Sequence, residues 1–143
     1  MKPLRFLILF LILVLPSNLR AETKLSYKIP SNYKQAKVIS FAKTLARNNS
    51  EILISSIDLN DDFIDEYIVK PASCNKSELC SFSIIALMND APVEIGQFNA
   101  QEIIILDNKN FGIKQLKIYN KASNDYAQSV AFWDPYQFKY VYK

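Results

Sequence analysis

The apolar positions near the N-terminus form one unbroken run of ten residues, Phe6–Leu15, which follows the basic residues Lys2 and Arg5. This run is too short to span a bilayer, whose hydrocarbon core of about 30 Å requires about twenty apolar residues. A basic start, a short apolar run and then a small residue are typical of a signal peptide. We therefore predict a signal peptide over residues 1–21 and a single domain over residues 22–143, with an uncleaved N-terminal anchor as the alternative.

A helical pattern follows over Tyr33–Arg47, where apolar residues recur at spacings of three and four. Ser31 or Asn32 is suited to cap its N-terminus, and the polar residues 48–50 end it. The pattern predicts one amphipathic helix with its lysines on a solvated face. The apolar face contains Val38, Phe41, Ala42 and Leu45.

From Ile52 onward the chain consists of short segments rich in Ile, Val, Phe and Tyr, separated by turn-forming residues. Because no second helix is evident, parallel crossovers between strands are not expected. We predict an α+β fold of two layers, in which one N-terminal amphipathic helix packs on an antiparallel β-meander. The predicted strands are Ile52–Leu59, Glu66–Lys70, Ser81–Met88, Val93–Phe98, Glu102–Leu106, Lys114–Tyr119, Ala127–Trp133 and Tyr136–Tyr142.

The charge balance narrows the choice of partners. Three of the 17 basic residues and none of the 14 acidic residues lie in the predicted signal peptide, so the mature chain carries 14 of each sign. A neutral chain has no electrostatic reason to bind nucleic acid or an anionic membrane. We predict no nucleic-acid partner and no stable membrane anchoring after removal of the signal peptide.

The absence of histidine limits the catalytic and metal sites that the chain could form. It removes the most common general base, the serine-type triad and most zinc or copper sites. The two glycines of the chain are too few for a glycine-rich phosphate loop. A hydrolase that works through carboxylates alone is the least favoured function, and we predict that the chain is not an enzyme.

The only two cysteines, Cys74 and Cys80, lie in the part of the chain that we predict to be exported. An oxidising compartment favours a disulfide between them. Closing so short a loop stabilises the fold by about 2–2.5 kcal/mol in the chain-entropy model. The alternative is two free thiols or half of a metal site, for which no other soft ligand lies nearby.

The candidate for chemistry is the acidic loop, residues 58–66, between two predicted strands. Counted from Asp58 as position 1, oxygen-bearing side chains stand at positions 1, 3, 5 and 9. This is the spacing of calcium loops, in which a tight turn gathers six to eight oxygens around the ion. Position 12 is Val69, so the glutamate of a helix–loop–helix calcium site is missing. The predicted Ca²⁺ ligands are the side chains of Asp58, Asn60, Asp62 and Glu66 and the backbone carbonyl of Ile64.

The loop resembles the D-x-[DN]-x-D-G-x-x-[DE] loops that lie between two strands in the FG-GAP repeats of β-propellers. The chain is also similar to small exported bacterial proteins of unassigned function, which combine such a loop with a Cys pair, an Asn-Gly hairpin and a C-terminal aromatic strand. The resemblance covers residues 52–142 and implies fold and export more than a function. The matching pieces are Asp58–Asp62, Glu66, Cys74, Cys80, Phe111–Ile113 and Trp133–Tyr136.

Phe63 departs from that pattern, because it occupies position 6, where calcium loops use glycine to reach a left-handed backbone conformation. A Cβ atom there costs roughly 1–2 kcal/mol. That cost weakens calcium binding by about 5- to 30-fold. The alternative interpretation is a solvated acidic hairpin without an ion.

The C-terminal segment 132–142 is dense in aromatic residues, which suit either a binding surface or a terminal hairpin turning at Asp134 and Pro135. Together these observations predict a small exported protein, periplasmic or secreted, that acts as a non-enzymatic binding or interaction module. It would have a protein partner and a weak calcium loop. The alternative is a secreted or periplasmic inhibitor of a hydrolase, which presents a rigid loop to a cleft.

Overall fold

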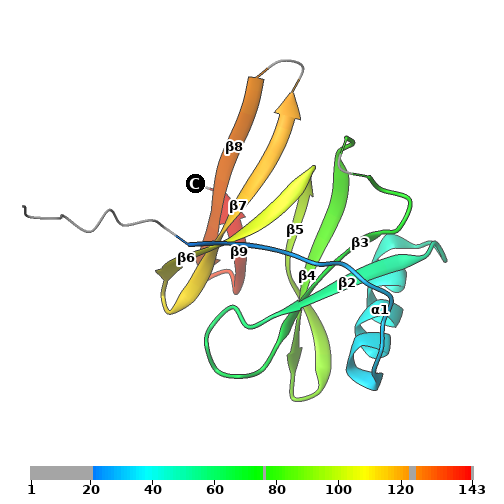
Figure 1. Cartoon of the computed structure of the whole chain (residues 1–143). Coiled ribbons are helices and arrows are strands. Elements are labelled where there is room, and N and C mark those ends of the chain that lie inside the picture. Colours follow the sequence, from blue (N-terminus) through cyan, green and yellow to red (C-terminus); the bar gives the residue numbers. More distant parts are fainter. Residues whose placement is uncertain (1–20, 76, 123–124, 143) are drawn as a thin grey trace, which may run out of the picture.

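The computed structural model describes residues 21–75, 77–122 and 125–142 (Figure 1). The predicted signal peptide therefore lies outside the described residues, except for Ala21. The described chain contains one helix and two antiparallel sheets, with strand orders β1-β6-β7-β8-β9 and β2-β3-β4-β5. The elements are β1 (Glu22–Lys24), α1 (Tyr33–Ala46), β2 (Ile52–Ile57), β3 (Glu66–Pro71), β4 (Cys80–Met88), β5 (Ala91–Ala100), β6 (Glu102–Asn110), β7 (Ile113–Ala122), β8 (Asp125–Asp134) and β9 (Lys139–Tyr142).

The predicted fold class is wrong, because the strands form a β-sandwich and not one meander under a helix. The chain leaves one sheet at the end of β5, at Ala100, and enters the other at Glu102. Between them, the Gln101 N–H donates to the carbonyl of Tyr119 at 2.8 Å, on β7 of the second sheet. A change of sheet between neighbouring strands leaves the apolar pattern of each strand intact, so the pattern could not reveal it.

One face of the sheet β2–β5 packs against the second sheet, and α1 covers part of the other face, over β2, β3 and Ile85 of β4. Along β3, Tyr67 and Val69 pack toward α1, whereas Ile68 between them packs into the core between the two sheets. The helix is thus a short cover on the outer face of a sandwich (Figure 1). The inter-sheet core includes Ile68, Phe82, Ile84, Ile103, Ile105, Leu116 and Ile118.

Helix α1 confirms the predicted helix, with a different face buried. The side chain of Asn32 caps it by accepting from the Gln35 N–H at 2.9 Å. Ile39 is buried, whereas Leu45, predicted to face the sheet, is 42% exposed. The buried Gln35 sets this rotation, because its amide donates to the Ser56 hydroxyl on β2 at 3.0 Å. No helix in the described part of the chain is long and apolar enough to cross a membrane.

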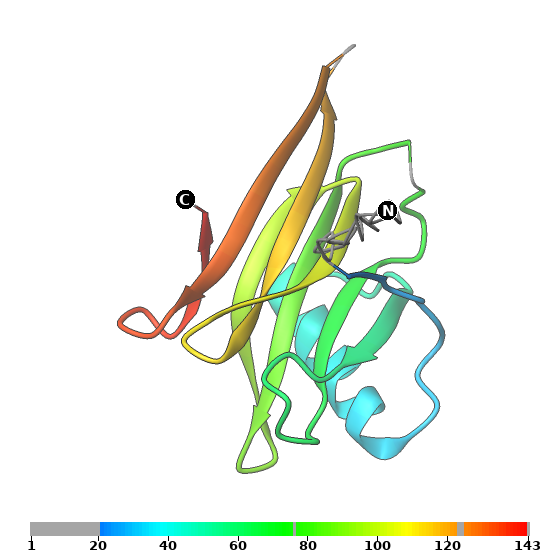
Figure 2. The ribbon, with the colours of Figure 1, turned by 60° about the vertical axis from the view of Figure 1, so that its left-hand side comes forward.

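Four hairpins turn at the same end of the sandwich (Figure 2). We call this region the loop end and define it as residues 58–65, 89–90, 111–112 and 135–138. Two of the turns have both central residues at positive φ, the arrangement that matches the twist of a two-residue hairpin. One of these turns is Asn89–Asp90, and the other is Phe111–Gly112.

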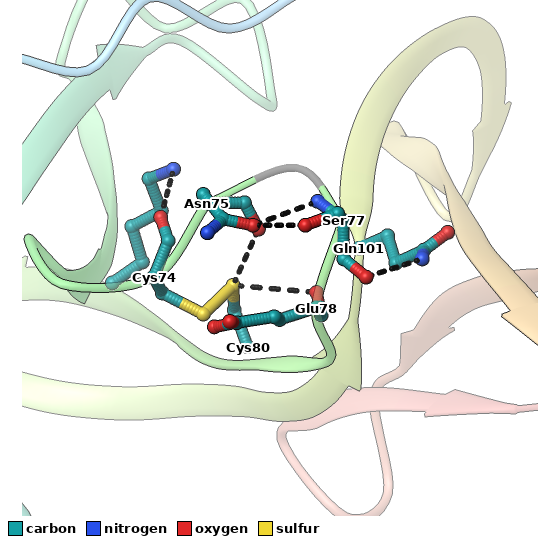
Figure 3. The surroundings of a disulfide bond; sticks show 7 residues. Cys74, Asn75, Ser77, Glu78, Cys80 and Gln101 are labelled. Carbon is teal, nitrogen blue, oxygen red and sulfur yellow. Dashed lines mark hydrogen bonds between the residues drawn. A yellow bond between two sulfur atoms is a disulfide. The ribbon is translucent and has the colours of Figure 1, made fainter.

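The opposite end of the sandwich carries the β3–β4 connection, which the disulfide between Cys74 and Cys80 closes (Figure 3). The two Cα atoms are 5.8 Å apart, which confirms the predicted disulfide. The amide of Gln101 donates to the carbonyl of Ser77 at 3.3 Å and ties this connection to the junction between the sheets. The disulfide therefore stabilises the end of the sandwich that lies opposite the acidic loop.

We predict that the double substitution Cys74→Ala and Cys80→Ala lowers the free energy of unfolding by about 2–3 kcal/mol, because it removes the cross-link from the unfolded chain. Urea denaturation under non-reducing conditions measures this change. The wild-type protein treated with a reductant should match the double variant. A loss below about 0.5 kcal/mol would contradict the expectation.

Candidate functional site

The loop end surrounds a cavity of about 460 Å³. All four hairpins contribute to its lining, so the site unites segments that are far apart in the sequence. The interior is mainly apolar, and polar groups come from the acidic loop and the β4–β5 turn. The lining includes Leu59, Ile64 and Glu66 from the β2–β3 hairpin, Asn89 from the β4–β5 turn, Ile113 from β7, and Trp133 and Phe138 from the β8–β9 hairpin.

The acidic loop folds around the carboxylate of Asp58. One oxygen accepts from the N–H groups of Asn60 at 3.2 Å and Asp62 at 3.3 Å, and the other accepts from Phe63 at 2.8 Å. The Asp62 carboxylate accepts from the Asn60 amide at 3.0 Å and from the Ile64 N–H at 2.8 Å. The loop is thus closed by its own hydrogen bonds.

Strand β7 fixes this loop to the second sheet. The Lys114 N–H donates to the carbonyl of Leu59 at 2.8 Å, and its ammonium donates to the carbonyl of Asp58 at 3.1 Å. The side chain of Leu59 is only 1% exposed, so the loop is also held by burial in the inter-sheet core. Asp61 forms ion pairs with Lys114, at 2.8 Å, and with Lys109.

The carboxylates of the loop differ in their proton affinity. Hydrogen bonds from Lys109 and Lys114 lower the pKa of Asp61 to about 2. Desolvation raises the pKa of Asp58, but hydrogen bonds from the N–H groups of the loop, that of Phe63 first, outweigh it, and its pKa is lowered. Both groups therefore stay ionised at neutral pH and keep the loop closed.

The pKa of Glu66 is shifted in the opposite direction, upward. Its side chain is buried, lines the cavity and accepts from the Leu59 N–H at 2.8 Å. Burial, together with the negative charges of Asp62 and Asp58, raises its pKa to about 7, against the lowering effect of the hydrogen bond from the Leu59 N–H. The buried hydroxyl of Tyr140 also has a raised pKa, in part because of Glu66, and donates to the carbonyl of Lys114 at 2.8 Å.

The predicted calcium ligands lie on one loop, but their functional groups are engaged differently. Asp58, Asn60 and Asp62 take part in the hydrogen bonds that close the loop. Asn60, Asp62 and Glu66 line the cavity, whereas Asp58 does not. Ile64 donates its N–H to Asp62 and exposes its side chain. In the described residues, no group of three or more His, Cys, Asp or Glu side chains is placed to hold a metal ion. The calcium site stays a prediction.

Phe63 adopts the left-handed conformation that we expected to require glycine, with a φ of 65°. Its side chain is 98% exposed. The described chain has seven residues other than glycine with positive φ, and six of them lie at the loop end. Three of the six are phenylalanines, and for a bulky residue this conformation costs roughly 1–2 kcal/mol. They are Phe63, Phe111 and Phe138.

The same end exposes large apolar side chains. Phe111 is 69% exposed and Tyr136, on the β8–β9 turn, is 96% exposed. Asp134 shapes that turn by accepting from the N–H of Tyr136 at 2.9 Å. Trp133 is buried beside them and packs edge-to-face on Phe138, with ring centroids 5.0 Å apart. The C-terminal aromatic segment thus forms both a terminal hairpin and part of an exposed surface.

The sequence did not reveal the cavity. Leu59, Ile95 and Trp133 line it, and in the sequence they have the pattern of ordinary core residues. The one available signal was Glu66, a carboxylate at the start of a strand whose next three residues are apolar. A carboxylate at this position is equally expected of a calcium ligand, so it did not point to a cavity.

The raised pKa of Glu66 makes stability depend on pH. Because its folded-state pKa of about 7 exceeds the ordinary value of 4.5, the group's contribution to stability is fully present below about pH 4.5 and is lost as the pH rises through about 7. Glutamine keeps the neutral form at every pH. We predict that Glu66→Gln melts close to wild type near about pH 5 and about 3–6 °C higher near about pH 8.

Melting curves of both proteins at the two pH values measure this difference. The matched control is Glu78→Gln, an exposed carboxylate on the disulfide-closed connection. It should shift the melting temperature equally at both pH values. Destabilisation by Glu66→Gln at the higher pH would mean that the fold requires the ionised carboxylate.

Comparison with protein-family models, curated proteins and solved structures finds no match to this chain. The resemblance to calcium-loop hairpins therefore rests on the sequence pattern alone.

Proposed function

We propose that this chain is a non-enzymatic binding module that contacts a protein partner through the loop end. The observation that carries the proposal is the set of three phenylalanines held there in the left-handed conformation, with Phe63 98% and Phe111 69% exposed. A fold keeps strained residues where they serve a purpose, and exposed aromatic residues are common anchors of protein interfaces.

The geometry around these residues supports a protein partner. Tyr136 adds a fourth exposed aromatic ring, and the cavity lies among the same turns. Aromatic anchors around a pocket resemble the centre of an interface, where a few side chains carry most of the binding energy. The buried core beneath and the ion pairs of Asp61 hold the turns in place, which reduces the entropy lost on binding.

The proposal includes export to the periplasm or the medium. The disulfide between Cys74 and Cys80 supports an oxidising compartment. The apolar run Phe6–Leu15 supports the signal peptide. A hydrolase inhibitor would use the same surface, with Phe63 and its neighbours presented to a cleft. The identity of the partner separates an inhibitor from another type of binding module.

A photoreactive phenylalanine analogue tests the surface directly. We predict that the full-length chain, made in its own organism, forms the same discrete adduct with a second protein from position 63 and from position 136. The control position is Leu79, which is 61% exposed at the opposite end of the sandwich. Equal adducts from all three positions, or an adduct from position 79 alone, would contradict the proposal.

Phe63→Gly separates binding from folding. Glycine relieves roughly 1–2 kcal/mol of left-handed strain, against about 0.5–1 kcal/mol of added chain entropy. The variant should therefore melt at or slightly above the wild-type temperature, yet bind the cross-linked partner at least about tenfold more weakly. Unchanged affinity would show that Phe63 is not an anchor.

Calcium binding is a second candidate, favoured by one observation: Phe63 already adopts the backbone conformation that calcium loops require. A site with a Kd of about 0.5 mM would add about 1.4 kcal/mol at about 5 mM calcium, a rise of several degrees in Tm. We expect magnesium not to reproduce the rise and Asp58→Asn to abolish it. Identical curves in EDTA and in calcium would remove calcium from the proposed function.

A further inference from the structure

The cavity at the loop end combines apolar walls with one buried acid. Ile95, Ile113 and Trp133 supply apolar surface, and Glu66, only 8% exposed, lines the same space. Asp62 and Asn60 add further oxygen atoms toward the acidic loop. An occupant that satisfies both parts needs an aliphatic body and a group that pairs with a carboxylate.

The charge of the cavity selects a cation. In the described part of the chain, its lining includes Glu66 and Asp62 but no lysine or arginine. Lys109 and Lys114, on the β6–β7 hairpin, are paired with Asp61. A buried carboxylate without a cationic partner is costly, and a ligand that brings a positive charge offsets that cost.

The hydrogen bonding of Glu66 favours an ammonium over a guanidinium. One carboxylate oxygen already accepts from the Leu59 N–H at 2.8 Å. A guanidinium binds best when both oxygens are free to accept its two parallel N–H groups. An ammonium is a compact charge that needs only the remaining lone pairs.

From this arrangement we infer that the cavity binds a lysine side chain of the protein partner. Its aliphatic stem lies along the wall formed by Ile95 and Trp133, and its ammonium pairs with the Glu66 carboxylate. The inference rests on the proposed function, because Phe63 and Tyr136, exposed on two of the turns whose hairpins line the cavity, are the surface that would bring such a side chain to it.

Hexylammonium is a suitable probe, because it carries the charge of a lysine side chain on an unbranched aliphatic stem, which is two carbons longer than that of lysine. Trp133 is the only tryptophan of the chain and lines the cavity, so its fluorescence reports occupancy. Titrations of the full-length protein in a mildly alkaline buffer should show saturable binding of hexylammonium. Neutral hexanol should bind about tenfold more weakly, because it lacks the charge-assisted hydrogen bond.

Substitutions test the contribution of the Glu66 carboxylate to binding. Glu66→Gln should weaken hexylammonium binding by about tenfold and leave hexanol binding unchanged. The matched control Glu78→Gln removes the same charge at the other end of the sandwich and should bind like wild type. Equal affinity for hexylammonium and hexanol, preferential binding of hexanoate, or no binding of any probe would each overturn the inference.

The partner experiment distinguishes this inference from the proposed function. Adducts from positions 63 and 136 without hexylammonium binding would leave the binding surface intact and overturn the lysine pocket. Hexylammonium binding that depends on Glu66, but without any adduct, would overturn the assignment to a protein side chain. Support for the inference requires both results, together with weaker partner binding by Glu66→Gln.

Discussion

Burial of the β2–β5 sheet by the second sheet on one face, and by α1 over part of the other, is the constraint on which the rest of the structure depends. Its strands carry apolar residues toward α1 and toward the second sheet, as Tyr67 and Ile68 show in adjacent positions of β3. Such a sheet needs two covers. The helix provides one, and the five-stranded sheet provides the other and encloses the larger core. The short helix is therefore required by the sandwich, although it does not define the fold.

The same constraint explains the position of the cavity. Core side chains fill the middle of the sandwich, but at the loop end the strands of each sheet end in hairpin turns. Across this end, the Lys114 N–H of one sheet donates to the carbonyl of Leu59 in the β2–β3 hairpin of the other. Leu59 reaches back into the core, while Glu66 occupies the space behind it. A carboxylate at this boundary interrupts the apolar packing. The cavity lies where two layers meet, and its polar group comes from the loop that closes them.

The elements could be predicted from the sequence more fully than their arrangement. The helix follows from its apolar spacing and its Asn32 cap, and the disulfide follows from two cysteines in a chain that the sequence predicts to be exported. Periodicity shows which residues are buried but not which layer buries them, so the change of sheet at Gln101 was missed and the fold class was wrong. The calcium spacing of the acidic loop identified residues that close the loop by hydrogen bonds, and Asn60, Asp62 and Glu66 among them also line the cavity.

The unfavourable features of this fold are concentrated at one end. Three phenylalanines with positive φ, a buried carboxylate with a raised pKa and several exposed aromatic rings all lie within four turns. The strained backbone and the buried carboxylate each lower stability and the exposed rings contribute little to it, whereas the opposite end has a disulfide that adds to it. Sequences usually agree with their fold at every level, and local conflicts concentrate where function requires them. Because these conflicts coincide in space although the residues are distant in the chain, a shared role at the loop end explains them better than separate accidents of packing.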